Sequence, residues 1–427
     1  MKKVILRDHR RISPFNEEAR DLRILNKPLW LLQRDVLARL CDAEIAVESP
    51  DQIPSAGELL VYRDSQFFNP PLIEEFVTRA LAGARPCQLA FAPDDRAVVA
   101  HVLPLQDSIV QDAQGFYRGE LWYYPAGRVP GAEAAALVID TEPLEMGWYH
   151  IPTYVVPTGN LTYQVPIKAF LPIESWVHVL LANSLFGAFG RARRALQESR
   201  RPGVRLSIGL LALLERKPVR SCSALVRVGR NCTIDGSAVI QGPTIIGNNV
   251  HIEAGALIVS SVIGDNVTIM PGAQLVASVV SNGCYIPFRA ALFGSSFMEN
   301  TMVAQNTVLQ GTVVGRNTFI GGGNVFTDYN LLASKPIRTM HNGKLVPVGM
   351  AALGSAIGHD CRIGAGFVIY PGRTIESGTI LIYRGDRAVI DHNIDAASAQ
   401  HDDRVVRLPD SPFVAEDVRG PSFQEPS

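Results

Sequence analysis

Between residues 228 and 326, aliphatic side chains return every six positions, with glycine, asparagine, aspartate or another small residue beside them. The period resumes after a longer break and runs from residue 357 to residue 381. A period of six is typical of a parallel β-helix, in which three short strands complete a coil of about 18 residues. The expected inward positions are Val228, Ile234, Ile240, Ile246, Ile252, Ile258, Ile263, Ile269, Leu275, Val280, Ile286, Leu292, Leu309, Val314, Ile320, Phe326, Ile357, Ile363, Ile369, Ile375 and Leu381.

The corners between these strands have their own pattern. Glycine or asparagine follows the aliphatic position in segments such as 246–249 and 263–266, and we expect these residues to supply left-handed backbone angles. An irregular turn is expected over residues 297–307. Three steps of five residues should shorten a corner without shifting the inward set: Ile258 to Ile263, Leu275 to Val280, and Leu309 to Val314.

Residues 1–172 have a different pattern, in which short apolar runs alternate with longer helical segments. This alternation predicts an α/β domain with a mostly parallel sheet. Strands are expected at residues 4–6, 58–62, 88–91 and 136–139, and helices at residues 29–41 and 71–81.

Further changes of pattern divide the rest of the chain. Residues 173–220 are expected to form a helical arm, with one long helix over 176–196 and a second before the β-helix. Residues 221–390 should form the β-helix, with a loop insertion at 331–350 where the period is lost. Residues 391–427 are rich in Asp, Ser, Pro and Arg, and we expect a flexible tail there.

The composition limits the kinds of binding partner and the cellular compartment that we expect for this protein. The 427 residues carry a formal charge of −1, which disfavours nucleic acid and fits two domains. Five local arginines are expected on a solvated helix face: Arg191, Arg193, Arg194, Arg200 and Arg201. The six cysteines have no metal or disulfide spacing, so a cytoplasmic location is predicted. No signal peptide is evident, and the apolar run 208–214 is too short to span a membrane.

Three segments carry chemical information. Residues 59–67 read as a strand followed by Asp64, whereas residues 7–15, after the first strand, contain no glycine that would let backbone amides close on a triphosphate. In the β-helix, residues 311–330 run from Gly311 through a glycine triplet to an Asp-Tyr-Asn sequence.

These segments and the order of the domains resemble the sugar nucleotidyltransferase and hexapeptide acyltransferase superfamily, in particular its bifunctional uridyltransferase/acetyltransferase members. The resemblance implies a left-handed β-helix, a homotrimer and acetyl-CoA as acyl donor. It also implies a sugar phosphate or nucleotide-sugar as substrate. The α/β domain would then be a degenerate nucleotidyltransferase-like domain, with Mg²⁺ only if it is active.

The resemblance also assigns candidate residues. Asp64 corresponds to the metal-binding aspartate, and a turn-capping role is the alternative. Asp328, Tyr329 and Asn330 correspond to the coenzyme site. Gln305 and Asn306 occupy the place of the catalytic histidine, and an amide is not a general base at neutral pH; they remain candidate substrate-binding residues.

The break in the period supplies further candidates, because a loop that leaves a rigid solenoid commonly carries ligand contacts. His341 is the candidate base, and Lys335 and Arg338 are suited to a phosphorylated or acidic ligand. A solvated loop is the alternative.

Three residues are assigned from their place in the period. Arg289 could face the same groove as the Tyr329 region, or could cover apolar surface. His251 and His359 are expected to be exposed.

Three functions are consistent with these observations. The first is a coenzyme A-dependent acyltransferase acting at clefts between β-helix subunits. The second is a sugar-1-phosphate nucleotidyltransferase that uses the amino-terminal domain. The third is a non-catalytic ligand-binding or scaffold protein. Fold alone does not choose among them.

Overall fold

The computed structural model describes residues 1–199, 201–330, 336–385, 387–408 and 411–414, apart from the side chains at 193, 196, 198 and 199. The chain divides into two compact units. Unit 1 comprises residues 1–12 and 17–182, and unit 2 comprises residues 13–16 and 183–427. A short amino-terminal segment therefore belongs to the unit that contains the hexapeptide repeats.

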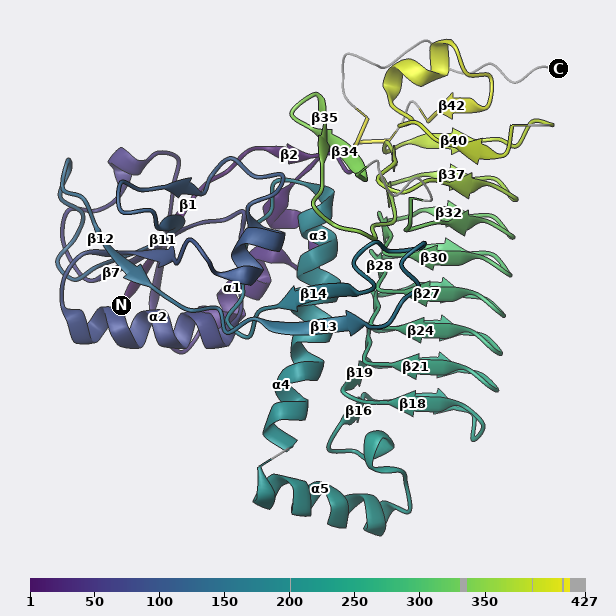
Figure 1. Cartoon of the computed structure of the whole chain (residues 1–427), viewed down its shortest axis with the longest axis horizontal. Coiled ribbons are helices and arrows are strands. Elements are labelled where there is room, and N and C mark those ends of the chain that lie inside the picture. Colours follow the sequence, from purple (N-terminus) through teal and green to yellow (C-terminus); the bar gives the residue numbers. More distant parts are fainter. Residues whose placement is uncertain (200, 331–335, 386, 409–410, 415–427) are drawn as a thin grey trace. The chain divides into compact units, whose positions relative to one another are not determined.

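Unit 1 is built on a mixed sheet with the strand order β12-β9-β11-β7-β1-β6 (Figure 1). Its strands are β1 (Lys2–Leu6), β6 (Ala43–Val47), β7 (Leu59–Arg63), β9 (Cys87–Phe91), β11 (Tyr117–Tyr124) and β12 (Ala135–Val138). β6, β1 and β7 are parallel, as are β9 and β12, while β11 runs antiparallel between the two groups and pairs with β10 (Val110–Gln111). The α/β interpretation is confirmed, but the sheet is mixed rather than mostly parallel, because the polar, aromatic β11 was not foreseen.

Two helices flank this sheet. α1 (Leu29–Leu37) ends earlier than expected, and α2 (Pro70–Gly83) is close to its prediction. The Asn69 side chain accepts a hydrogen bond from the Leu72 amide at 3.2 Å and caps α2. Smaller pairings complete the unit: β2 (Arg11–Ile12) with β3 (Glu17–Glu18), β4 (Arg23–Ile24) with β5 (Lys27–Pro28), β8 (Gln66–Phe68) with β15 (Phe170–Pro172), and β13 (Leu144–Trp148) with β14 (Leu161–Val165).

A helical segment leads into the repeats, as predicted. It consists of α3 (Trp176–Asn183), a π-helical stretch (Ser184–Phe189) and α4 (Gly190–Ser199), and α5 (Pro202–Glu215) follows. Pro202 occupies the first turn of α5, where its missing amide hydrogen costs no hydrogen bond. No helix in the described part of the chain is long and apolar enough to cross a membrane.

The described part of unit 2 forms three stacked sheets that wind into a solenoid (Figure 1). The first sheet contains β16 (Val226–Val228), β19 (Thr244–Ile246), β22 (Val262–Ile263), β25 (Val279–Val280), β28 (Ser296–Phe297), β31 (Val313–Val314), β36 (Ala356–Ile357) and β39 (Thr374–Ile375). The second contains β17 (Thr233–Ile234), β20 (His251–Ile252), β23 (Thr268–Ile269), β26 (Tyr285–Ile286), β29 (Met302–Val303), β32 (Phe319–Ile320), β37 (Arg362–Ile363), β40 (Thr379–Leu381) and β42 (Val405–Arg407). The third contains β18 (Val239–Gln241), β21 (Leu257–Val259), β24 (Gln274–Val276), β27 (Ala291–Phe293), β30 (Val308–Gln310), β33 (Val325–Phe326), β38 (Val368–Ile369) and β41 (Val389–Ile390).

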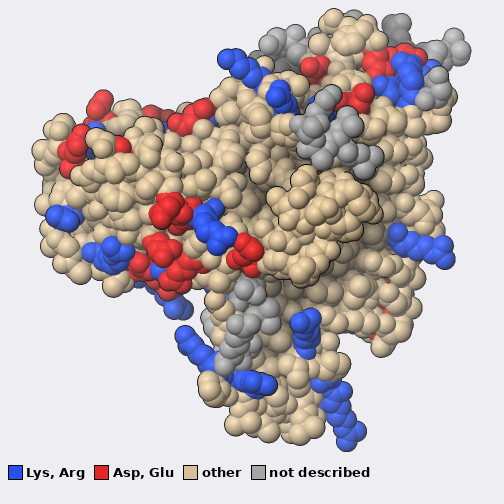
Figure 2. Space-filling view, viewed as in Figure 1, with Lys and Arg blue, Asp and Glu red and all other residues tan. Residues whose placement is uncertain are grey.

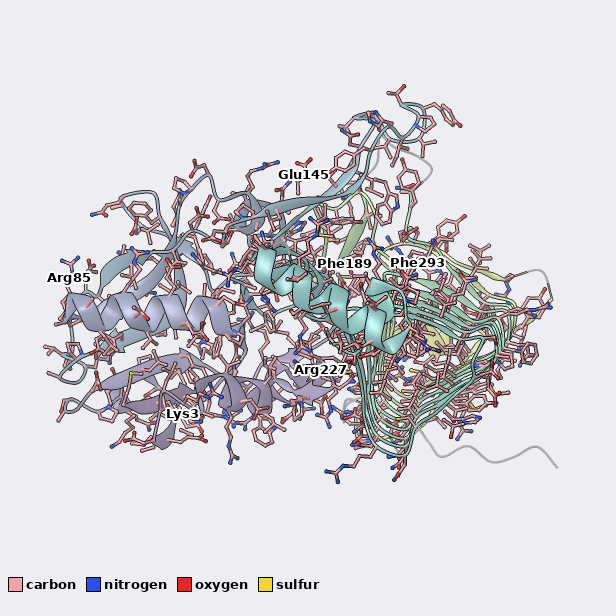
Figure 3. The ribbon with its side chains drawn as sticks, turned by 90° about the horizontal axis from the view of Figure 1, so that it is seen from below. Lys3, Arg85, Glu145, Phe189, Arg227 and Phe293 are labelled. Atoms are coloured by element: carbon pink, nitrogen blue, oxygen red, sulfur yellow. The ribbon has the colours of Figure 1, made fainter. Side chains whose placement is uncertain are left out.

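The solenoid core contains the inward aliphatic side chains that the period predicted, together with corner residues such as Val250 and Phe367. The expected inward residues from Ile246 to Leu381 are at most 2% exposed and form one apolar cluster. The prediction of an irregular turn at 297–307 is wrong. Phe297 and Val303 are completely buried and continue the series of inward side chains. Alternate residues point outward, as Phe293 does in Figure 3. The repeat and the stacked parallel strands fit a left-handed β-helix.

The corners of the solenoid correct one detail of the prediction. The left-handed residues lie two or three positions after the aliphatic residue and include glycines such as Gly255 (φ 66°) and asparagines such as Asn249 (φ 55°) and Asn266 (φ 57°). The asparagine side chains also join successive coils, since Asn249 Nδ2 donates to Asn266 Oδ1 at 3.1 Å. The glycines directly after the aliphatic residue serve a different purpose: a Cβ on Gly247 would lie 2.6 Å from the carbonyl carbon of Gly264. These glycines allow neighbouring coils to approach closely.

The carboxy-terminal segment is more ordered than predicted. Residues 396–400 form a 3₁₀ turn capped by Asp395, and β42 pairs antiparallel with β40. Arg404 forms a bidentate ion pair with Asp402, with a shortest distance of 2.7 Å. The prediction of a flexible tail from residue 391 is therefore wrong for residues 391–408, because this segment completes the last coils. Residues 409–410 and 415–427 lie outside the described residues.

Candidate functional site

The break in the repeat forms a β-hairpin that leaves and rejoins one corner of the solenoid. β34 (Arg338–His341) pairs antiparallel with β35 (Lys344–Pro347). The ends of the insertion are joined where Tyr329 bridges to Ala352 and the Leu353 amide donates to the Asp328 carbonyl at 2.7 Å. The expected loop at 331–350 is thus a structured hairpin over its described part.

Asp328 and Tyr329 lie at the root of this hairpin. Both side chains and that of Asn330 are partly buried. Burial raises the pKa of the Asp328 carboxyl above its ordinary value, and its own backbone amide opposes that rise only in part. A carboxyl with a raised pKa at a half-buried corner is a group that can accept or share a proton with a ligand.

His341 ends β34 and is partly buried at the turn of the hairpin. Its Nε2 lies 3.2 Å from Asn342 Nδ2, a geometry in which the amide can orient the imidazole. Arg338 begins the same strand with an exposed side chain, and its carbonyl accepts from Arg373 Nη2 at 3.2 Å. Lys335 lies outside the described residues, so its proposed role stays a prediction.

A second group of predicted residues occupies a different corner. Arg289 (φ 58°) and Asn306 (φ 57°) are equivalent left-handed positions on neighbouring coils, and Gln305 precedes Asn306. All three are exposed, and the Gln305 carbonyl accepts from the Gly323 amide at 3.0 Å.

The structure therefore brings together Arg289, Gln305 and Asn306, and separately Asp328, Tyr329 and Asn330 with the hairpin. A strand of the third sheet, β30 or β33, separates the two corners within one chain. The expectation that Arg289 shares a groove with Tyr329 stays a prediction, because the two residues lie at opposite ends of the third-sheet strands.

His359 is completely buried, so its predicted exposure is wrong. The ring lies between Phe15, at 5.3 Å, and Phe413, at 4.4 Å. Its Nδ1 accepts from the Arg316 amide at 2.8 Å. The segments that contain Phe15 and Phe413 are distant in sequence and cover this corner. The repeat pattern did not predict either contact. His251 is exposed as expected and pairs with Glu253 at 2.6 Å.

In unit 1, Asp64 follows β7 and is 1% exposed. Its Oδ1 accepts from the Asp8 amide at 2.9 Å, and its Oδ2 lies 3.3 Å from Arg7 Nε and 3.4 Å from Arg20 Nη1. Burial raises the pKa of Asp64 to about 7, against the lowering influence of the Asp8 amide and Arg7. No sequence pattern pointed to Arg20, which lies 44 residues from Asp64.

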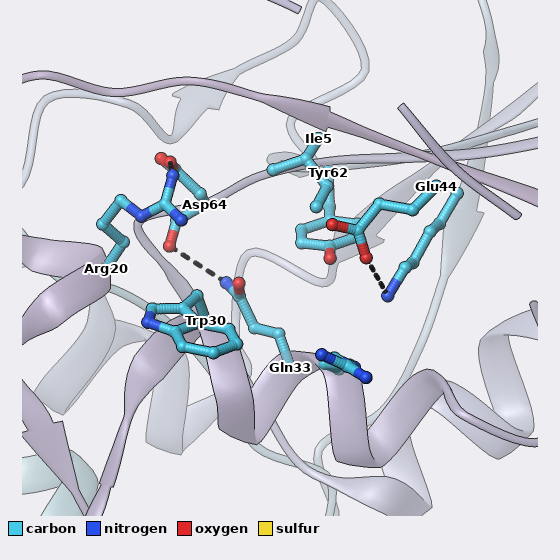
Figure 4. Close-up of a pocket in the computed structure, with 9 residues that line it drawn as sticks. Ile5, Arg20, Trp30, Gln33, Glu44, Tyr62 and Asp64 are labelled. Atoms are coloured by element: carbon cyan, nitrogen blue, oxygen red, sulfur yellow. Dashed lines mark hydrogen bonds and ion pairs between the residues drawn. The ribbon is translucent and has the colours of Figure 1, made fainter. Parts of the chain in front are cut away.

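A small hollow adjoins Asp64 beside α1 (Figure 4). Its volume is about 50 Å³, which accommodates one or two water molecules rather than a nucleotide. Its lining residues are Lys3, Ile5, Arg20, Trp30, Gln33, Arg34, Glu44, Tyr62 and Asp64.

The surroundings of Asp64 do not fit Mg²⁺. This cation takes oxygen ligands, whereas the carboxylate here contacts two guanidinium groups and an amide hydrogen. In the described part of the chain, no group of three or more His, Cys, Asp and Glu side chains could hold a metal ion. Asp64 is better explained as the centre of a buried hydrogen-bonded cluster.

Comparisons with known proteins agree with the repeat. Residues 226–259 match the family described as bacterial transferase hexapeptide (six repeats). The chain is similar to a UDP-N-acetylglucosamine acyltransferase from Campylobacter jejuni, at 18% identity and a TM-score of 0.30, over 39% of this chain and 62% of that chain. It is also similar to a proposed acetyltransferase from Desulfovibrio desulfuricans, at 16% identity and a TM-score of 0.24, over 42% of this chain and 29% of that chain. The chain thus spans less than two thirds of either protein. A search of curated proteins found no match.

The hexapeptide match covers only the first coils, before the hairpin and both groups of candidate residues. It supports the class of solenoid that hexapeptide transferases use. The side chains at the corners of this solenoid determine which reaction it can support.

Proposed function

We propose that unit 2 is an acyltransferase that uses acetyl-CoA and acts on a sugar phosphate or nucleotide-sugar at the hairpin corner. The observation that carries this proposal is the hairpin itself, which places His341 on a structured insertion rooted at Asp328 and Tyr329. The hexapeptide transferase match supports the same class of reaction.

His341 acts as the general base in this proposal. Its imidazole accepts the proton of the acceptor hydroxyl or amine while that oxygen or nitrogen attacks the thioester carbonyl. The carbon–sulfur bond then breaks, the acyl group stays on the acceptor, and the coenzyme thiolate takes up a proton. Arg338, together with Lys335, would pair with phosphate on either substrate. Asp328, Tyr329 and Asn330 would contact the coenzyme.

In a homotrimer, a neighbouring subunit would bring the second group of candidate residues to the hairpin site. Arg289, Gln305 and Asn306 lie at another corner of the same chain, and a second copy would present its own set to the hairpin site. Exposed apolar side chains on the second sheet, Met302 at 44% and Phe319 at 39%, offer a surface for such a contact. A cytoplasmic location remains part of the proposal, and all six cysteines are free.

A turnover assay tests this proposal. Release of free coenzyme A from acetyl-CoA would be followed with a thiol reagent and a panel of amino-sugar phosphates and nucleotide-sugars. Wild type should turn over at least one acceptor, and His341→Ala should lower kcat by about 10²–10⁴-fold. The control His251→Ala removes an exposed imidazole on a coil face and should leave the rate unchanged. Equal loss in both variants would contradict the role of His341.

Non-catalytic ligand binding is the second candidate, and one observation favours it. The amides of Gln305 and Asn306 stand where the resemblance places a catalytic histidine, and both are exposed. Binding of a sugar phosphate without release of coenzyme A would support this candidate. A nucleotidyltransferase in unit 1 is the weaker alternative, because Asp64 is held by arginines and the adjoining hollow is small.

A further inference from the structure

α5 has two apolar faces, and within the described residues one of them is packed while the other is exposed. Ile208 and Ala212 are buried in a small cluster with Cys222, against which Leu225 packs. Leucines at positions i, i+4, i+7 and i+8 follow another face of the helix. They are Leu206, Leu210, Leu213 and Leu214, which are 66%, 53%, 75% and 81% exposed. A stripe this exposed is not needed to pack the helix.

The apolar surface continues onto neighbouring residues of the same unit. Val219, in the turn after α5, is 53% exposed. Val228 and Ile234 hold inward positions of the first coil, yet they are 46% and 36% exposed because no earlier coil covers them. Figure 1 shows α5 beside this first coil, near β16 and β18. The end of the solenoid and the outer face of α5 therefore present apolar side chains together.

Basic residues surround this apolar surface. Arg201, Arg205, Arg216, Lys217 and Arg220 are all exposed. Glu215 is the acidic residue within the same segment, and its carboxylate already accepts from the Ser223 amide at 3.0 Å and lies 3.6 Å from Lys217. Blue side chains gather around α5 in Figure 2. A local basic excess in a chain of formal charge −1 indicates a negatively charged partner.

We propose that the α5 surface docks on a lipid bilayer that contains anionic headgroups. Leucines on one helix face can enter the boundary between headgroups and acyl chains, while flanking arginines pair with lipid phosphates. A second copy of this chain fits less well, since a symmetric contact would place like-charged arginines opposite one another. Nucleic acid would satisfy the arginines but offers no hydrocarbon for the leucines. The inference goes beyond the proposed acyl transfer and does not depend on it.

Vesicle flotation tests the proposal with the full chain. Wild type should float with vesicles of phosphatidylcholine and phosphatidylglycerol, and much less with phosphatidylcholine alone. The double variant Leu213→Glu/Leu214→Glu should reduce the bound fraction at least about tenfold. The pair Arg205→Glu/Arg216→Glu should remove the preference for phosphatidylglycerol. Leu81→Glu is the matched control, because Leu81 is a 48% exposed leucine on α2, and it should bind like wild type.

Thermal unfolding would confirm that each variant is folded. Absence of wild-type flotation with the anionic vesicles would overturn the proposal, as would undiminished flotation of the Leu213/Leu214 variant. Light scattering without lipid tests whether a second copy of this chain binds to the α5 surface instead. A self-association that the Leu213/Leu214 variant abolishes, with no flotation of wild type, would assign the surface to a second copy instead.

Discussion

The hydroxyl of Ser377 donates a hydrogen bond to the carbonyl oxygen of Pro14 at 2.9 Å, across 363 residues of sequence. The same oxygen of Ser377 accepts from the His359 amide at 2.8 Å. Asn16 Nδ2 donates to the Phe413 carbonyl at 3.0 Å. Residues 13–16 thus form part of the late coils of the solenoid, although they lie near the amino terminus.

The first prediction concerns this anchoring segment. Phe15 is completely buried against the His359 ring, so Phe15→Ala should lower the free energy of unfolding by about 3–5 kcal/mol. Urea denaturation of the full chain measures this loss. Phe288→Ala is the control, because Phe288 is 44% exposed on the solenoid, and it should cost less than about 1 kcal/mol. A loss for Phe15→Ala as small as that expected for the control would mean that the 13–16 segment does not stabilise the solenoid.

The second prediction concerns the packing of the hairpin on the next coil. Gly372 (φ 73°) would place a Cβ 2.3 Å from the Arg338 carbonyl oxygen, whereas a Cβ on Gly366 (φ 79°) would meet open space. Both alanine variants carry the left-handed backbone penalty of about 1–2 kcal/mol. Gly372→Ala must also displace the hairpin, so it should weaken acetyl-CoA binding while Gly366→Ala should not. Calorimetric titration of the two proteins compares them, and equal affinities would contradict a site at the hairpin.

The third prediction is a pH dependence of stability. Burial raises the pKa of folded Asp64 from 3.8 to about 7. Its contribution to stability is therefore full below about pH 4 and is lost as pH rises towards 7. An asparagine cannot ionise, so the stability of Asp64→Asn relative to wild type should rise between about pH 5 and pH 8, by roughly 2 kcal/mol.

Urea midpoints at both pH values test this dependence, because the pH-independent cost of losing contacts to Arg7 and Arg20 cancels in the comparison. A constant difference between the two proteins, or one that falls with pH, would show that Asp64 is ionised throughout.

The fourth prediction concerns the cysteines. Burial raises the pKa of Cys284 and of Cys361 to about 12 and that of Cys41 to about 11. Because the thiolate is the reactive form, none of the three should react readily with a thiol reagent in the native protein at pH 8. Partly exposed Cys232 should react first. Mass spectrometry of the labelled peptides identifies the order in which the cysteines react. Rapid labelling of Cys284 would indicate that the solenoid opens.

The solenoid could be predicted from the sequence because each coil contributes its core locally. The six-residue spacing from Ile246 to Leu381 determines which side chains face inward, and those residues are buried. In unit 1 the alternation of short apolar runs with longer helical segments also located β7 and α2. β11 escaped notice because its polar and aromatic run does not alternate cleanly, although it is the longest described strand of its sheet.

Long-range contacts could not be predicted from the same pattern. The burial of His359 depends on Phe15 and Phe413, and the pairing of β42 with β40 depends on a chain reversal outside the period. The candidate site shows the same limit. The break in the repeat identified the segment that carries His341, but not that it forms a hairpin or that Arg289 lies at another corner.

The central claim is that the hairpin corner binds acetyl-CoA, and calorimetric titration tests it most directly. Acetyl-CoA would be titrated into wild type, His341→Ala and Gly372→Ala, with UTP plus Mg²⁺ titrated separately into wild type. The account predicts saturable binding of acetyl-CoA by wild type, similar affinity in His341→Ala, weaker binding in Gly372→Ala, and no heat from UTP. Heat from UTP with none from acetyl-CoA would contradict it and assign the function to unit 1.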